Sequence, residues 1–546
     1  MMHEETNTVL KPIDEVDIHF GLISPNDYNL AMQTLDYQLL YQYLNEREDC
    51  FCERIIHPDV ESIETGTPLV EFDILNFTMH YTWFNYFNMV DMLKKANIPP
   101  LRKDRTDEDS LIIANGPSVT ANPMPLSDFI DIFFIGNDES VFDDFLDLYK
   151  KFENPKEHLE EFAKIDGLYI PELNNKTNIV LVKDMDKKYH NTKPIKMGDD
   201  EQNRINRIYL DVARGCSRSC RFCINGYLYK PLIEASVEKL LDVAEESRKN
   251  SGINRVLMTA DAIADYSGFD ELISNLKQRN FHIELTAARI ESITQESLEQ
   301  LKESGANEIA INPESVDRIR KSMNKDIPED VIQDVIRNAF ELGLNIRCSF
   351  MLGFPNETEE DIIDLADYIK SIVNTKNSIN DELYVRFRVS LVVPKPCTPL
   401  QWEAYDLELM ESKIDLFLSQ FDDFDLEFLK YTQNGIGYMD RSNNFKLDIN
   451  SNESTYKEYI LSCGDRDVSE LLLNGNINSP IDEWRKYFKS YDVGDVLPWD
   501  IIDMGYINNF IENEHGKIRK GKLTPWCDVS PCYNCRDICY KNPKTI

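Results

Sequence analysis

The sequence predicts an α/β protein with two successive sheet domains and a small cysteine-rich C-terminal region. Strand-length apolar runs alternate with amphipathic helical segments over residues 16–146 and again over 206–420. A charged, irregular stretch that contains Pro155, Pro171 and Pro194 separates the two parts. The 546 residues suffice for about three domains. We therefore place a first domain at 1–165, a linker at 166–205, a second domain at 206–420 and a C-terminal region at 421–546.

The first domain is expected to be a doubly wound parallel sheet. Its strands are expected at Val16–Ile23, Phe51–Ile56, Phe72–Met79, Ser110–Ala114 and Asp131–Ile135. Ligands of such sheets bind at the carboxyl ends of the strands. Gly116 and Gly136 lie in the turns that follow the fourth and fifth strands, where glycine allows the backbone to approach a ligand closely.

The second domain is expected to contain six strand-helix units. Its strands are expected at 207–213, 254–259, 281–287, 307–312, 345–351 and 384–392. In barrel-like folds of this type, the active site lies at the carboxyl ends of the strands. The residues directly after each strand are therefore the first candidates for function.

A cysteine triplet with the spacing C-x3-C-x2-C, formed by Cys216, Cys220 and Cys223, follows the first strand of this domain. Three thiolates can hold a [4Fe-4S] cluster and leave the fourth iron without a protein ligand. The alternative is a zinc knuckle, which needs a fourth Cys or His nearby. The closest histidine, His190, is far along the chain, so the spacing favours the cluster.

This triplet, with Phe222 just before its third cysteine, resembles the signature of the radical S-adenosylmethionine (SAM) superfamily. The resemblance implies a partial (β/α)6 barrel whose open iron chelates SAM. It also implies reductive cleavage of SAM to a 5'-deoxyadenosyl radical, Phe222 in the cofactor site, and a reductant protein such as ferredoxin or flavodoxin as partner.

Two further strand ends resemble SAM-binding segments of that superfamily. Thr259-Ala-Asp-Ala262 stands where many members have Gly-Gly-Glu, so Asp261 is a candidate for the SAM amino group. Asn312-Pro-Glu-Ser315 with Arg318 resembles the Pro-Glu segment near the SAM ribose and methionine. A buried Glu314 needs a partner that offsets its desolvation, and the SAM ammonium would serve. The alternative is a solvated carboxylate on a surface loop.

The loops of the first domain, Gly116 and Gly136 included, resemble those of cobalamin-binding domains fused to radical SAM enzymes. Many such domains carry Asp-x-His-x-x-Gly, whose histidine binds the cobalt. The nearest string here, Asp17-Ile-His-Phe-Gly21, has the wrong spacing and lies inside a predicted strand. We therefore expect cobalamin without a protein histidine ligand, or else an ordinary flavodoxin-like domain that binds no cofactor.

Four cysteines close to the C-terminus, Cys527, Cys532, Cys535 and Cys539, form a second metal-binding pattern. Four thiolates within thirteen residues suit a second [4Fe-4S] cluster or a structural zinc. The isolated Cys397 is interpreted as a buried or spectator thiol.

The composition limits the classes of partner. A net charge of −37 argues against nucleic acid as a partner, since Lys and Arg supply the attraction to phosphate. The N-terminal residues have no signal-peptide pattern, and no apolar run reaches the roughly 18 residues of a membrane span. We therefore expect a soluble, cytoplasmic protein. Its cysteines are expected to be metal ligands or buried thiols.

The order of the segments resembles an uncharacterised family of radical SAM proteins with a cobalamin-binding-like N-terminal domain and a cysteine-rich tail. Its markers include Asn122-Pro-Met-Pro125, Met323-Asn-Lys325 and Ser462-Cys-Gly-Asp-Arg466. The resemblance implies cobalamin-dependent C-methylation of an unactivated carbon. The alternatives are a non-methylating radical SAM enzyme with an auxiliary cluster and an empty N-terminal domain, and a noncatalytic iron-sulfur protein. The sequence does not name the substrate.

Overall fold

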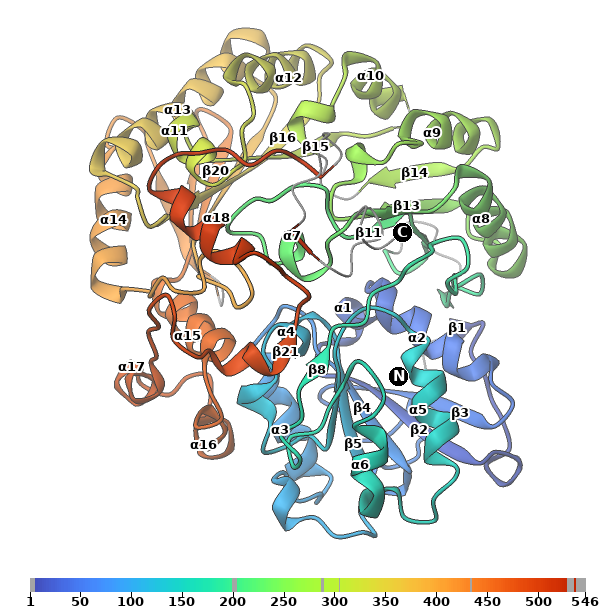
Figure 1. The fold of residues 1–546 in the computed structure, drawn as a ribbon. Coiled ribbons are helices and arrows are strands. Elements are labelled where there is room, and N and C mark those ends of the chain that lie inside the picture. The colour runs from blue at the N-terminus through green and yellow to red at the C-terminus, as the bar shows by residue number, and fades with distance from the viewer. Residues whose placement is uncertain are drawn as a thin grey trace.

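The computed structural model describes residues 5–198, 204–285, 289–303, 305–432, 435–527 and 535–536. An N-terminal sheet domain lies beneath a curved array of strand-helix units in Figure 1, and C-terminal helices run along one side of both. None of the helices in these ranges is long and apolar enough to span a membrane.

The N-terminal domain is a doubly wound sheet with the strand order β3-β2-β4-β5-β6-β7. The first five strands are parallel, which confirms the predicted fold class, and β7 is antiparallel to β6. The strands are β2 (Ile18–Ser24), β3 (Cys50–Ile56), β4 (Ile74–Thr78), β5 (Leu111–Asn115), β6 (Ile132–Phe134) and β7 (Leu168–Tyr169). The helices are α1 (Tyr28–Met32), α2 (Leu35–Glu46), α3 (Asn85–Lys95), α4 (Pro117–Ala121), α5 (Val141–Tyr149) and α6 (Leu159–Phe162).

Successive side chains of these strands point to opposite faces of the sheet, so they contribute to two separate hydrophobic cores, one on each face. On β2, Phe20 and Leu22 pack with α2 and α5 on one face, whereas Ile23 packs with α3 on the other. Because both faces are covered, the strands read as almost continuous apolar runs.

The segment that we expected to be a linker, 166–205, is tied into the fold at several points. Its first residues form β7, the last strand of the N-terminal sheet. Its later residues pair as β8 (Thr177–Asn178) with β21 (Ile502–Asp503), and as β9 (Lys196–Met197) with β1 (Glu5–Thr6). Two-residue strands carry too little pattern to be recognised in sequence.

The second domain contains the six predicted parallel strands, arranged as β10-β13-β14 and β15-β16-β17. Figure 1 shows the two sheets curving around a common interior with the helices outside. The strands are β10 (Ile208–Asp211), β13 (Arg255–Thr259), β14 (His282–Leu285), β15 (Glu308–Glu314), β16 (Asn345–Leu352) and β17 (Val385–Leu391). The helices are α8 (Val237–Ser251), α9 (Phe269–Gln278), α10 (Gln295–Glu303), α11 (Asp317–Ser322), α12 (Glu329–Glu341), α13 (Glu359–Ile379) and α14 (Leu407–Ser419).

The C-terminal region first extends this second sheet and then returns to the N-terminal domain. β20 pairs with β17 in parallel, and β19 and β18 continue the sheet in antiparallel order. The later helices pack across the domain boundary, where the ring of Phe87 lies 5.7 Å from that of Trp484. The elements are β18 (Glu427–Thr432), β19 (Gly435–Asp440), β20 (Phe445–Asn450), α15 (Asn452–Cys463), α16 (Val468–Asn474), α17 (Ile481–Trp484) and α18 (Phe510–Ile518).

Candidate active site

The cysteine triplet lies on a loop between β11 (Ala213–Arg214) and α7 (Asn225–Leu228). Cys216 and Cys220 are buried and Cys223 is partly exposed. Gly215 precedes the loop with φ of +78°, and a Cβ there would lie 2.0 Å from the carbonyl oxygen of Tyr229. Only glycine fits this close approach, so the loop has a fixed starting point.

The three thiols are close enough to influence one another electrostatically. Burial, followed by the nearby Cys223 and Cys220, raises the pKa of Cys216 to about 12. Burial and Cys220 likewise raise the pKa of Cys223 to about 12. Such thiols ionise readily only when cationic irons replace their protons. In the described residues no three His, Cys, Asp or Glu side chains converge on a single ion, but a cubane binds each thiolate at a separate iron. The donor set therefore fits the expected cluster.

Buried Lys230 organises the loop from its inner side. Its Nζ donates to the carbonyl oxygen of Arg218 at 2.7 Å and to Ser219 Oγ at 3.1 Å. It also lies 3.4 Å from the carbonyl oxygen of Cys216. The Lys230 ammonium thus donates hydrogen bonds to carbonyl oxygens that the tight turn would otherwise leave without a hydrogen-bond donor.

A fully buried ion pair joins the loop to the C-terminal helix. Arg221 Nη2 lies 3.0 Å from Glu514 Oε2 of α18, and neither side chain is exposed. The same guanidinium donates to the carbonyl oxygens of Ser322 and Lys522. Asn324 adds a second link, because it donates to Ser219 O and accepts from the backbone N–H of Thr524.

The beginning of the cysteine-rich tail rests on the same loop. The backbone N–H of Cys527 donates to Ser217 O at 2.9 Å, and the guanidinium of Arg218 lies over the ring of Trp526. Cys535 is buried with Tyr227 and α18. Cys532 and Cys539 lie outside the described residues, so their predicted metal site stays a prediction.

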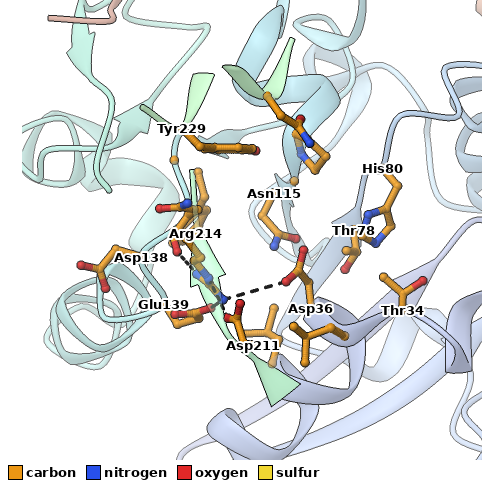
Figure 2. Close-up of a pocket in the computed structure, with 18 of the residues that line it drawn as sticks. Thr34, Asp36, Thr78, His80, Asn115, Asp138, Glu139, Asp211, Arg214 and Tyr229 are labelled. Atoms are coloured by element: carbon orange, nitrogen blue, oxygen red, sulfur yellow. Dashed lines mark hydrogen bonds and ion pairs between the residues drawn. The ribbon is translucent and has the colours of Figure 1, made fainter. Parts of the chain in front are cut away.

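A cavity of about 440 Å³ separates the N-terminal sheet from the loop and the second domain. The strand ends of β4, β5 and β6 form one wall, through residues such as Thr78, Gly116 and Gly136. The opposite wall is formed by Asp211 at the end of β10, Asn225 of α7 and Asp261 after β13. The carboxyl ends of both sheets therefore open onto one space (Figure 2).

Arg214 is the charged centre of this cavity. In Figure 2 its guanidinium lies among Glu139, Asp211 and Asp36. Burial alone would raise the pKa of Asp211, but the charges of Lys188 and Arg214 lower it to about 2. Arg214 also donates to the carbonyl oxygen of Asn137, so it connects the end of β6 with the start of the cysteine loop.

Asp261 faces the cavity at the end of a hydrogen-bonded chain that crosses the domain boundary. Tyr81 donates to Asn225 Oδ1, and Asn225 Nδ2 donates to Asp261 Oδ1 at 2.5 Å. Asp261 is exposed to the open cavity, but the protein atoms that surround it raise its pKa to about 6 by desolvation, and the Asn225 hydrogen bond limits that rise. The carboxylate is therefore ionised at neutral pH and can receive a cation.

Gly116 and Gly136 line the cavity as predicted, but the protein itself requires glycine at both positions. Their φ angles are +112° and +137°. A Cβ at Gly116 would lie 2.3 Å from the carbonyl oxygen of Met79, and one at Gly136 would lie 1.9 Å from that of Val180. Close packing of backbone on backbone accounts for these glycines without a ligand.

The structure supplies protein partners for Glu314 and Arg318. Glu314, with φ of +68°, pairs with Lys325 Nζ at 2.6 Å, so a lysine fills the role that we expected of the SAM ammonium. Arg318 binds Asp361 at the start of α13 and does not line the cavity. Phe222 packs edge-on against Phe354, with ring centroids 5.8 Å apart.

Two polar residues of the cavity wall, Thr78 and His80, were not predicted individually from the sequence. Asn76, Thr78 and His80 alternate along and just beyond β4. Asn76 Oδ1, Thr78 Oγ1 and His80 Nε2 are buried and have no hydrogen-bond partner among the described residues, and burial lowers the pKa of His80. Polar residues at i, i+2 and i+4 of an otherwise apolar strand share one face, and that period could have revealed them.

We predict that Glu514→Gln disturbs the cysteine loop. Removal of one charge from a buried pair costs about 3–5 kcal/mol, because the remaining Arg221 charge is left uncompensated. The variant should incorporate less iron and show an altered electron paramagnetic resonance (EPR) spectrum of the reduced cluster. Glu512→Gln, at an exposed position of the same helix, is the control. Unchanged iron content and spectrum in Glu514→Gln would refute the role of the pair.

Two family models match the chain in the order that the fold suggests. The model for radical SAM proteins, N-terminal, matches residues 36–171, and the radical SAM superfamily model matches residues 210–369. Together they span more than half of the chain.

Individual relatives are similar to different extents of the chain. An uncharacterised protein of Methanocaldococcus jannaschii is 26% identical over 461 residues, which cover 83% of this chain and 90% of the relative. The ribosomal protein uS12 methylthiotransferase RimO of Thermoanaerobacter sp. is 31% identical over 176 residues, which cover 30% of this chain and 40% of RimO. The radical SAM methyltransferase TsrM of Kitasatospora setae was solved with cobalamin and a [4Fe-4S] cluster. Its structure matches this one with a TM-score of 0.49 at 13% identity, and the match covers 71% of this chain and 78% of the TsrM chain. From the two family models and the cysteine loop, the chain belongs to the radical SAM superfamily and is an enzyme whose cofactors are a [4Fe-4S] cluster and SAM.

Proposed function

We propose that this enzyme is a cobalamin-dependent radical SAM methyltransferase that acts on an unactivated carbon. The observation that carries the proposal is the single cavity between the carboxyl ends of the N-terminal sheet and the cysteine loop. A methyl donor must reach the same substrate carbon from which the radical removes hydrogen, so both cofactors need to open onto one space.

The wall of β4 fits a large ligand that carries amide groups. Thr78 and His80 offer buried hydrogen-bonding atoms that have no partner among the described residues, and a corrin has amide side chains that can pair with them. Phe134, Val141 and Phe142 provide an apolar surface in the same cavity. When bound, the cluster and SAM would supply the radical, and methylcobalamin would supply the methyl group.

The residues of the opposite wall position SAM and exclude water. Asp261 would accept a hydrogen bond from the SAM amino group as a carboxylate, and Asn225 would fix the orientation of that carboxylate. Since Asn225 lies two residues after Cys223, the same short helix that follows the cluster ligands orients this carboxylate. Tyr81 completes the chain from the N-terminal domain.

A second candidate is a non-methylating radical SAM enzyme with an auxiliary metal centre in the tail. The contact of Cys527 with Ser217 favours it, since that contact brings the tail next to the cluster loop. Two results together would support this candidate. The Cys527→Ala/Cys535→Ala variant would lose two iron atoms or more while it keeps its first cluster, and the wild type would bind no corrinoid.

Reconstituted protein is expected to cleave SAM to 5'-deoxyadenosine when a strong reductant is added. Cys216→Ala, Cys220→Ala and Cys223→Ala should each abolish the product, because the cluster needs all three thiolates. Cys348→Ala, at a buried thiol of β16, is the control and should retain its cluster and activity. Full SAM cleavage by Cys220→Ala would refute the assignment.

The affinity for SAM should depend on pH through Asp261. The folded pKa of about 6 lies above the usual carboxyl value, so the group loses its charge as the pH falls through 6. The dissociation constant of SAM should rise below that pH. Asp261→Asn should weaken binding about tenfold at pH 8, since a hydrogen bond to a charged group contributes about 1.5 kcal/mol or more.

Two observations separate Asp261 from other titrating groups in this experiment. The pH profile of Asp261→Asn should be flat between pH 5 and 7. 5'-Methylthioadenosine, which lacks the amino acid part of SAM, should bind wild type without pH dependence in that range. A pH-dependent profile in Asp261→Asn would assign the titration to another residue.

Anaerobically supplied methylcobalamin should remain bound after desalting and show a corrin absorption band. Asp36→Trp, which places an indole in the cavity, should abolish retention. Asp144→Trp, at an exposed position of α5 outside the cavity lining, should not. If the wild type retains no corrinoid, the methyltransferase proposal falls and the non-methylating enzyme becomes the leading candidate.

A further inference from the structure

The segment after α18 has the opposite charge from the rest of the chain. Residues 519–527 contain three Lys or Arg residues and no Asp or Glu, whereas the whole protein has 59 basic and 96 acidic residues. In Figure 1 this segment is the red chain that leaves α18.

The positive charges of this segment face solvent. Arg519 is 71% exposed, and Lys520 and Lys522 are also exposed. Leu523 and Trp526 add large apolar side chains that are 45% and 38% exposed. We call Arg519, Lys520, Lys522, Leu523 and Trp526 the basic patch. Trp and Arg side chains are enriched at protein interfaces, and lysines beside them add the positive charge that attracts an acidic partner.

The nearby carboxylates leave the basic patch largely unneutralised. Glu514 is turned inward to Arg221 and Lys517. Glu403 lies 3.6 Å from Arg519 and 2.9 Å from His515. Within the part of the chain that the structure describes, no carboxylate forms an ion pair with Lys520 or Lys522.

Hydrogen bonds connect the backbone of this segment directly to the cluster loop. Arg221, which stands between Cys220 and Cys223, donates to the carbonyl oxygen of Lys522 at 2.6 Å. At the other end of the patch, Cys527 donates to Ser217 O, next to Cys216. A protein bound to the patch would thus contact a segment that is hydrogen-bonded to the loop that carries the cluster ligands.

We propose that the basic patch is the docking surface for a small acidic protein that donates one electron. The proposal rests on the requirement of the radical SAM reaction for a reduced cluster. The donor loses one electron and the cluster gains it, passing from the 2+ to the 1+ state without proton transfer. A net charge of −37 repels an acidic donor over the molecule as a whole, so a local positive surface beside the cluster selects the productive orientation.

The test is a charge reversal, Arg519→Glu/Lys520→Glu/Lys522→Glu. The control reverses three exposed lysines of the N-terminal domain and the following segment, Lys103→Glu/Lys164→Glu/Lys187→Glu. Reduction of the reconstituted cluster is followed by stopped-flow absorbance, with reduced flavodoxin or with the methyl viologen radical as donor. Equal iron content in all variants is checked first.

At low ionic strength, the patch variant should react with flavodoxin at least about tenfold more slowly than wild type, and its rate should no longer fall as salt is added. Its reaction with methyl viologen, which needs no docking surface, should not slow. The control should behave as wild type. An unchanged flavodoxin rate in the patch variant, or an equal loss in the control, would overturn the proposal.

Two other outcomes also decide the matter. If the patch variant loses affinity for single-stranded RNA while its flavodoxin rate stays normal, the patch is a nucleic-acid surface and the proposal is wrong. If viologen reduces the cluster of the wild type but SAM is not cleaved, the proposed enzymatic function fails while the docking result still stands on its own.

Discussion

The buried ion pair between Arg221 and Glu514 is the interaction on which the cluster site depends. The two residues are 293 positions apart, and both are completely excluded from solvent. Such a pair adds little to the stability of the folded state compared with an apolar replacement of both residues. Removal of only one of the two charges, however, strongly destabilises the fold. It therefore favours the one geometry in which the cysteine loop and α18 are docked together.

This dependence gives the C-terminal region a role in the chemistry of the second domain. α18 supplies Glu514, and the chain after it supplies carbonyl and amide groups to Arg221, Asn324 and Ser217. The same chain carries the basic patch on its outer side. Cluster positioning and the proposed docking of an electron donor thus belong to one segment, with the inner side bound to the loop and the outer side open to solvent.

The cavity imposes the second constraint. Arg214 precedes Gly215 and Cys216 and pairs with Glu139 beyond β6, while Asn225 follows Cys223 and accepts a hydrogen bond from Tyr81 beyond β4. Both ends of the cysteine loop are therefore attached to the N-terminal sheet. A rearrangement of that sheet by a ligand would act on the loop from both sides, which fits a reaction that needs both sites at once.

The sequence was sufficient for the parts of this structure that depend on local pattern. Apolar runs placed the strands of both sheets, and the cysteine spacing found the loop, because periodicity and spacing are properties of neighbouring residues. Long-range pairing was not accessible. Nothing local distinguishes Glu514 among 96 acidic residues as the partner of Arg221, or Lys325 as the partner of Glu314. Gly116 and Gly136 were recognised as special, but their cause, contact with the Met79 and Val180 carbonyls, needed the fold.

The central claim is that the cluster loop and the N-terminal sheet serve one shared cavity. EPR spectroscopy of the protein that holds both a reduced [4Fe-4S] cluster and Co(II) cobalamin tests it most directly. Two paramagnets in one cavity are coupled through space, so each signal should be broadened relative to the singly loaded protein. Two signals that add without any mutual broadening would contradict the account.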